Sequence, residues 1–278
     1  MKLLTPLFYA CICLLLFSCG SDKPKFVKSP VDNIITKYID KSNYSVILAD
    51  MDYKEDTDSY FHKYQILIDE GAPTLSQIEL NDTTAVATDI KIEKTDWLKV
   101  SPITFDEYKG DLGMTILSKK NGVLDKNSSP AGVDNYVGNT RYGHWQTNSS
   151  GGSFWAFYGR YRLMSDLFYG PRYGGYGYGG YSRSHYNDYN RNYRNKQSYY
   201  GANKEHGTKS NRNTTSSWSK KSSTFKNNVN SKVTKSASTL RSRGYSSSKS
   251  YSKSSRTSRS GSRYSNSSSR SRSGGFGK

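Results

Sequence analysis

The sequence has almost no cysteine, and its few cysteines lie near the start. Only Cys11, Cys13 and Cys19 occur in 278 residues. Everything after Cys19 therefore lacks the sulfur atoms that a disulfide framework or a cysteine-based metal site requires. Exported proteins often use disulfides, but we expect none here.

Long apolar runs are also missing. The longest spans residues 3–17 and is interrupted by Pro6, whereas a membrane-spanning helix needs about 20 apolar residues. A short apolar run directly after Met1-Lys2 is instead typical of a signal peptide. We therefore expect residues 1–18 to be a signal peptide that is removed.

The combinations of residues that carry catalysis or bind metals are absent from the sequence pattern. None of the four histidines has a Cys, Asp or Glu at zinc-ligand spacing. Residues 138–143 lack the Lys-Ser/Thr of a phosphate-binding loop, and the acidic residues 50–58 lack the Gly and closing Glu of a calcium loop. We predict that the protein is not an enzyme and that it uses no cofactor or metal. The alternative is an enzyme built on residues 142–155, which would need a convergent pocket.

Acidic residues are scarce in the C-terminal part of the chain. Residues 171–278 hold 23 Lys and Arg against 2 Asp and Glu, a net charge of +21, whereas residues 1–170 hold 18 against 21. Aliphatic residues are also rare there, so we predict that residues 171–278 are disordered and bind an anionic partner through charge. The candidate polyanion contacts are Arg172, Arg183, Arg191, Arg194, Arg241, Arg243, Arg256, Arg259, Arg263, Arg270 and Arg272.

The apolar run ends in Leu16-Phe17-Ser18-Cys19, which resembles the lipobox of bacterial lipoproteins. The resemblance implies that Cys19 is lipidated and becomes the first residue of the mature protein, so that several acyl chains hold it in a membrane. Residues 19–29 would then be a polar tether. We expect the protein in the cell envelope, at the outer membrane, and leave open the periplasmic or surface face. An ordinary signal peptide is the alternative, against which Leu16 argues, because such peptides carry a small residue there.

Residues 30–170 have the pattern of one α+β domain, with a leading helix on a small, mostly antiparallel sheet. Ser29-Pro30 followed by Asp32 predicts the start of that helix, and Ser101-Pro102 predicts a second one. Asn121-Gly122 predicts a hairpin turn. Alternating apolar residues predict strands over residues 44–53, 60–68, 86–92, 114–118 and 123–124.

An aromatic block follows the predicted sheet. Residues 128–152 are rich in Gly, Asn and Ser but also carry aromatic rings, so we expect this loop to pack on the domain. Residues 153–169 have apolar side chains at helical spacing and predict a helix. Loops concentrate binding residues, and tryptophan is prominent at interfaces. The candidate binding residues are therefore Tyr142, His144, Trp145, Trp155 and Tyr158; the alternative is that these rings close the core.

Four short stretches resemble a block found in uncharacterised lipoproteins of the Bacteroidota. They are Asp111-Leu112-Gly113-Met114, Tyr136-Val137-Gly138-Asn139, Tyr142-Gly143-His144-Trp145 and Ser153-Phe154-Trp155-Ala156-Phe157-Tyr158-Gly159. The resemblance covers roughly residues 40 to 170. It implies a place in the cell envelope and brings no activity with it.

Two functions compete for this sequence. The first is a non-enzymatic, membrane-anchored envelope lipoprotein whose folded body docks an unknown protein partner. Its tail would bind anionic lipid, lipopolysaccharide or acidic polysaccharide. The alternative is an exported nucleic-acid-binding protein, because Arg interleaved with Tyr can bind phosphates and stack on bases. A merely solvated basic spacer is a third interpretation of the tail.

Overall fold

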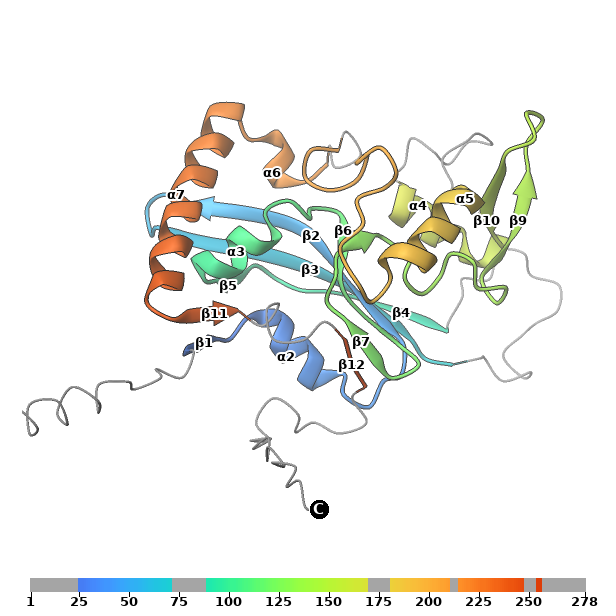
Figure 1. The fold of residues 1–278 in the computed structure, drawn as a ribbon, viewed down its shortest axis with the longest axis horizontal. Coiled ribbons are helices and arrows are strands. Elements are labelled where there is room, and N and C mark those ends of the chain that lie inside the picture. Colours follow the sequence, from blue (N-terminus) through green and yellow to red (C-terminus); the bar gives the residue numbers. More distant parts are fainter. Residues whose placement is uncertain (1–24, 72–88, 170–180, 211–214, 248–253, 257–278) are drawn as a thin grey trace, which may run out of the picture.

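The computed structural model describes residues 25–71, 89–169, 181–210, 215–247 and 254–256, and its centre is an antiparallel sheet (Figure 1). The strands lie in the order β12-β7-β6-β2-β3-β4, with β5 beside β3 and β8 beside β6. Helices cover this sheet, so the predicted α+β class is confirmed. The sheet strands are β2 (Tyr44–Lys54), β3 (Ser59–Asp69), β4 (Ile90–Lys94), β5 (Leu98–Val100), β6 (Met114–Lys120), β7 (Val123–Asp125), β8 (Ser129–Pro130) and β12 (Ser254–Arg256).

Strands β2 and β3 form the middle of the sheet and bury side chains on both of its faces. Successive side chains of a strand point to opposite faces. Val46 and Leu48 belong to one hydrophobic cluster, and Ile47 and Leu67 to another. The sheet is therefore covered by two separate layers, one on each face.

The first layer contains α2 (Pro30–Lys37) and α3 (Pro102–Tyr108), which begin where the sequence predicted. The backbone N–H of Ser29 donates to the carboxylate of Asp32 at 2.8 Å, as in a capping box. At the second helix the Ser101 hydroxyl accepts from the Thr104 N–H at 3.1 Å. The predicted turn at Asn121-Gly122 is also confirmed, because both residues have the positive φ that a type I′ hairpin requires.

The second layer is the aromatic block, and here the predicted helix over residues 153–169 is partly wrong. Residues Ser153–Phe157 form β10, which pairs antiparallel with β9 (Gly143–Thr147), and α4 covers only Arg162–Tyr169. The run Ser-Phe-Trp-Ala-Phe has apolar residues at both spacings, but its aromatic residues favour a strand. Gly151 has a φ of +79° in the connecting turn, and the register places Trp155 opposite Trp145.

The sequence predicted disorder from residue 171 onward. This prediction is wrong for residues 181–210 and 215–247, which are folded. The first stretch contains α5 (Arg183–Asp188) and a π-helical turn, η4 (Tyr189–Tyr193). The second contains α6 (Ser217–Lys220), α7 (Ser223–Ser242) and β11 (Tyr245–Ser247). The remaining residues of the predicted tail lie outside the described residues, apart from the backbone of β12.

Aromatic rings explain this error, because the prediction counted only aliphatic residues. Tyr181, Tyr189 and Tyr199 are buried in the second layer, and Trp218 is buried in the first. A buried aromatic side chain removes 150–250 Å² from water, which is enough to offset the entropy of ordering a short segment. The folded part therefore extends beyond the predicted boundary at residue 170.

Helix α7 packs across α3 and closes the first layer (Figure 1). Its apolar stripe consists of Val229, Val233 and Ala237, each buried and four residues apart, so that they lie on one helix face. Trp218 meets Phe105 of α3 edge to face at 5.6 Å. After α7, strand β11 pairs in parallel with β1 (Lys25–Val27), so the first described strand lies beside the segment that follows α7.

Candidate functional site

The five candidate residues of the aromatic block do not share one surface. Tyr142 and Trp155 are buried, with 1% and 2% of their surface exposed. The Tyr142 hydroxyl donates to Asp69 at 2.9 Å, and the Trp155 ring meets the Trp145 ring edge to face at 5.1 Å. Both buried residues therefore serve the core, as the alternative interpretation held.

His144 and Tyr158 do lie at the surface. The hairpin register pairs His144 with Ala156, which places its ring on the face opposite Trp145 and Trp155. The His144 and Tyr158 rings stack at 5.4 Å with an interplanar angle of 26°. Tyr158 is 40% exposed, one of two large hydrophobic side chains that are this exposed in the described residues. These two rings form the accessible part of the predicted binding surface.

Trp145 is half-buried and lies between the core and a small groove. The Arg183 guanidinium lies over its indole ring at 5.8 Å, and the Tyr186 ring lies 5.5 Å away. The groove has a volume of about 350 Å³ and is lined by Asn148, Gly152, Ser153, Phe154, Ser182, Arg183 and Ser184. Hydroxyl, amide and guanidinium groups beside an aromatic ring suit the binding of a polar or anionic group.

The candidate arginines fall into four groups. Arg183, Arg191 and Arg243 are exposed, and Arg241 pairs with Asp106 at 2.8 Å. Arg194 has a structural contact, because its guanidinium donates to the backbone carbonyls of Val133 and Asp134. The others, Arg172, Arg256, Arg259, Arg263, Arg270 and Arg272, have side chains outside the described part of the structure, and Cys19 also lies outside it.

His62 has a structural role in the core. Its ring is fully buried between Tyr64 and Phe105, and its Nδ1 lies 3.0 Å from the Tyr64 hydroxyl. Burial lowers the pKa of His62 to about 3, so the imidazole is neutral at physiological pH. Within the described ranges, no group of three His, Cys, Asp or Glu could hold a metal ion.

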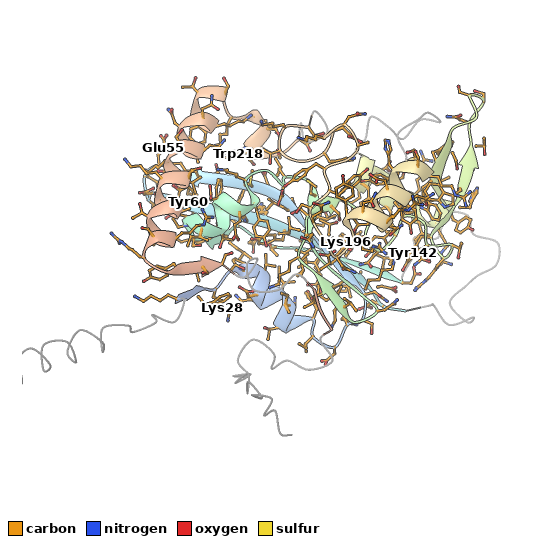
Figure 2. The ribbon with its side chains drawn as sticks, in the orientation of Figure 1. Lys28, Glu55, Tyr60, Tyr142, Lys196 and Trp218 are labelled. Carbon is orange, nitrogen blue, oxygen red and sulfur yellow. The ribbon has the colours of Figure 1, made fainter. Side chains whose placement is uncertain are left out.

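Ion pairs connect the aromatic block to the central sheet. Arg141 pairs with Asp69 at 3.0 Å and with Asp89 at 2.7 Å, and the Tyr161 hydroxyl also donates to Asp89. The Asp89 side chain has no exposed surface. These groups join β3, the start of β4 and the block, so their role is structural. Figure 2 shows Tyr142 among the side chains of this layer and Trp218 at the other end of the molecule.

A feature that the sequence prediction missed is a cavity of about 530 Å³ beside the β6–β7 hairpin. Its wall contains Lys120 and Asp134 from the body and Tyr189, Arg194 and Asn195 from the stretch that was predicted to be disordered. The sequence could not place these residues together, because the two segments are far apart in the chain and β9, β10, α4 and α5 lie between them. Neither the segment around Lys120 and Asp134 nor the segment around Arg194 has a sequence pattern that indicates a cavity.

The edge formed by β1 and β11 brings together the two parts of the chain with predicted envelope roles. Lys25 pairs with Tyr245 in the parallel register, and the Lys25 ammonium lies over the Tyr245 ring at 5.5 Å. Cys19 precedes this pair by six residues, and the basic C-terminal residues follow it. Figure 2 labels Lys28 at the same edge.

In the part of the chain that the structure describes, no helix combines the length and the apolar character needed to cross a membrane. Comparison with protein-family models, with curated proteins and with solved structures finds no match to this chain. The resemblance to envelope lipoproteins therefore stays a prediction from the sequence.

Proposed function

We propose that the protein is a lipid-anchored, non-enzymatic component of the bacterial cell envelope that holds a basic C-terminal segment against an anionic surface. The observation that supports this most strongly is the parallel pairing of β1 with β11. It places the end of the predicted tether and the start of the last basic segment at the same edge of the fold.

Distance along the chain makes this pairing relevant to a membrane. The six residues from Cys19 to Lys25 span at most about 21 Å when fully extended. If Cys19 carries acyl chains, the β1–β11 edge stays within that distance of the lipid headgroups. The segment after Ser247 then begins close to the same surface.

The charge of that segment suits an anionic surface. It contains no Asp or Glu, and its basic residues are Lys249, Lys253, Arg256, Arg259, Arg263, Arg270, Arg272 and Lys278. Each Lys or Arg near an anionic membrane contributes about 1 kcal/mol, within a Debye length of about 8 to 10 Å. About three simultaneous contacts would strengthen binding by roughly a hundredfold.

The exposed rings of His144 and Tyr158 are the part of the body best suited to dock a protein partner. His144 lies on β9 and Tyr158 directly follows β10, and this hairpin lies at the end of the molecule opposite α7, away from the β1–β11 edge (Figure 1). A protein held by its anchor at one edge would thus present this face away from the lipid. Aromatic side chains with polar atoms are enriched at such interfaces.

The membrane contact is tested with two soluble chains that both begin at Gly20, one ending at Lys278 and one at Ser247. We expect the longer chain to bind vesicles containing anionic lipid roughly a hundredfold more tightly at low salt, and to lose this advantage as salt rises. Neither chain should bind neutral vesicles.

A matched control carries the same residues 248–278 in shuffled order. Because the proposal rests on charge, the shuffled chain should bind like the natural one. Loss of binding on shuffling, or binding that survives high salt, would contradict the proposal. Tight binding to single-stranded DNA that weakens when the tail tyrosines are replaced by Ser would favour the nucleic-acid alternative.

A further inference from the structure

The cavity beside the β6–β7 hairpin has the size of a small-molecule site and a mostly polar lining. Its volume of about 530 Å³ lies within the range of 300–1,000 Å³ found for ligand pockets. Polar groups from two distant parts of the chain converge on it: Lys120 at the end of β6, and Arg194 with Asn195 after η4. Convergent polar groups in a pocket are the usual geometric sign of a binding site.

Lys120 supplies a cation that the protein itself barely uses. Among the described residues, its ammonium makes one long hydrogen bond, to the backbone carbonyl of Asp134 at 3.4 Å. Burial and the positive charge of Arg194 together lower the pKa of Lys120 to about 8, while the Asp134 carboxyl acts in the opposite direction. The cavity therefore holds two cationic groups whose mutual repulsion a bound anion would relieve.

The two carboxylates in the wall are already engaged elsewhere. Asp134 accepts from the hydroxyls of Ser45 and Thr115, and Asp125 accepts from the backbone N–H groups of Asn127 at 2.9 Å and Asn195 at 2.7 Å. Burial raises the pKa of both carboxyl groups, which reduces their tendency to carry charge. Neither carboxylate forms an ion pair with Lys120, so both compete weakly with an incoming anion.

Arg194 completes the cationic wall. One of its terminal nitrogens donates to the carbonyls of Val133 and Asp134, and its guanidinium lies over the Tyr189 ring at 5.2 Å. This fixes the plane of the group and leaves its other nitrogen atoms available. A fixed guanidinium is well suited to carboxylate and phosphate oxygens.

We propose that this cavity binds a small molecule through a carboxylate or phosphate group, held between the Lys120 ammonium and the Arg194 guanidinium. Binding is strongest when Lys120 is protonated, so affinity falls as pH rises through the range in which the lysine loses its proton. The titratable groups that face Lys120 are Asp125, Asp134, Tyr189 and Arg194. This proposal does not depend on membrane anchoring.

The test follows the reactivity of individual lysines in the purified full-length chain. An acylating reagent is applied over a pH series, and peptide-resolved mass spectrometry measures the modification of Lys120 and of Lys99, an exposed lysine on β5. Inorganic phosphate and acetate are added separately, with chloride at equal ionic strength as the reference. Residue-resolved detection keeps the many basic residues of the tail from obscuring the result.

We expect Lys120 to react with a midpoint near pH 8. A bound anion that raises the pKa of Lys120 by one unit slows its modification about tenfold below the midpoint, while Lys99 stays unchanged. Protection by acetate alone or by phosphate alone identifies the group that the site prefers. Equal reaction rates in both anions and in chloride, or equal protection of Lys99, would overturn the proposal.

A variant provides an independent measurement. Lys120→Met keeps the length of the side chain but removes its charge, and it should abolish the increase in melting temperature that the protecting anion causes. Lys99→Met is the matched control and should keep that increase. If Lys120→Met fails to fold, the labelling of the unmodified chain still decides the question.

Discussion

His62 is the residue whose protonation should matter most for stability. Its pKa is about 3 in the folded protein and about 6.5 in an unfolded chain. Between these values only the unfolded state binds the proton, so stability falls as pH decreases from about 6.5 toward 3. The loss reaches about 2 kcal/mol at pH 5, since each pH unit in this window costs about 1.4 kcal/mol.

Replacing His62 by Leu should remove this part of the pH dependence. The test compares the free energies of unfolding of the natural chain and His62→Leu at pH 7 and pH 5. Between pH 7 and pH 5, the free energy of unfolding of the natural chain should fall by about 2 kcal/mol more than that of His62→Leu, whichever protein is more stable at pH 7. His144→Leu, at an exposed histidine, is the control and should leave the slope unchanged; an identical slope for His62→Leu would contradict the assignment.

Cys19 is the residue on which the envelope address depends. If the lipobox is processed, Cys19→Ala should produce a precursor that takes up no labelled fatty acid and keeps its signal peptide. Cys13→Ala, in the same apolar segment, should be labelled like the natural protein. Uptake of label by Cys19→Ala would refute lipidation at this position.

Among the elements, the β9–β10 hairpin and the residue that follows it contain both buried and exposed aromatic side chains. Trp155 fills the interior, so Trp155→Ala should lower the free energy of unfolding by about 3–5 kcal/mol. Tyr158→Ala should change it by only about 0.5 kcal/mol, because Tyr158 is exposed and stacks on His144. Urea unfolding of both variants tests this, and equal losses would show that the exposed rings are also structural.

Local sequence signals predicted several elements of the fold but missed the β9–β10 hairpin. The capped helices, the two long strands and the Asn121-Gly122 turn each carry a local signal, and each was confirmed. The hairpin was missed because Phe154 and Phe157 fit a helical spacing as well as a strand. Pairing with β9 decided between them, and no local pattern reports a partner strand.

Helix α7 was missed for a different reason. Its sequence carries a helical pattern of apolar residues, but the composition of the surrounding segment predicts disorder. Val229, Val233 and Ala237 recur every four residues, and Phe225 precedes them at the same spacing. The prediction of disorder was based on how few aliphatic residues the whole of residues 171–278 contains, and it did not consider the spacing of these four side chains. It folds on the body, where α3 provides the complementary surface.

Trp218 connects this C-terminal element to the core. It contacts Phe105 and Phe225 and is 2% exposed, so Trp218→Ala should cost about 3–5 kcal/mol of stability. Lys220→Ala, at an exposed position on the same short helix, is the matched control with an expected change of about 0.5 kcal/mol or less. Comparable melting temperatures for the two variants would mean that residues 215–247 contribute little to the fold.

At the scale of the whole molecule, the position of the domain boundary decides how much of the basic charge belongs to the folded part. The net charge of +21 after residue 170 was assigned to one disordered tail, but much of it lies on folded segments. Some of these cations are paired: Lys221 with Asp52, Lys232 with Asp58 and Arg241 with Asp106. The body's acidic residues thus neutralise part of the C-terminal charge, whereas the sequence after Ser247 contains eight basic residues and no acidic ones.

Truncation of the chain tests this division. A chain covering residues 20–247 keeps both core clusters intact and should unfold at the same temperature as residues 20–278. A chain ending at residue 214 loses Trp218, Val229 and Val233, which belong to the first core cluster. Exposing the apolar surface that they cover should lower the melting temperature by more than 10 °C or prevent cooperative unfolding, since each kcal/mol shifts it by roughly 2–4 °C at this chain length.

The fragment of residues 30–170 is the strictest comparison, because it is the domain that the sequence predicted. It lacks β1 and β11, the clamp of α7 on α3, and the buried rings of Tyr181, Tyr189 and Tyr199. Both faces of the sheet would lose part of their cover, so we expect this fragment to be aggregated or only partly folded by calorimetry and circular dichroism. The opposite result would be cooperative unfolding of residues 30–170 near the melting temperature of the full chain. It would support the domain boundary predicted from the sequence. The C-terminal segments would then be an accessory layer that packs on an already complete domain.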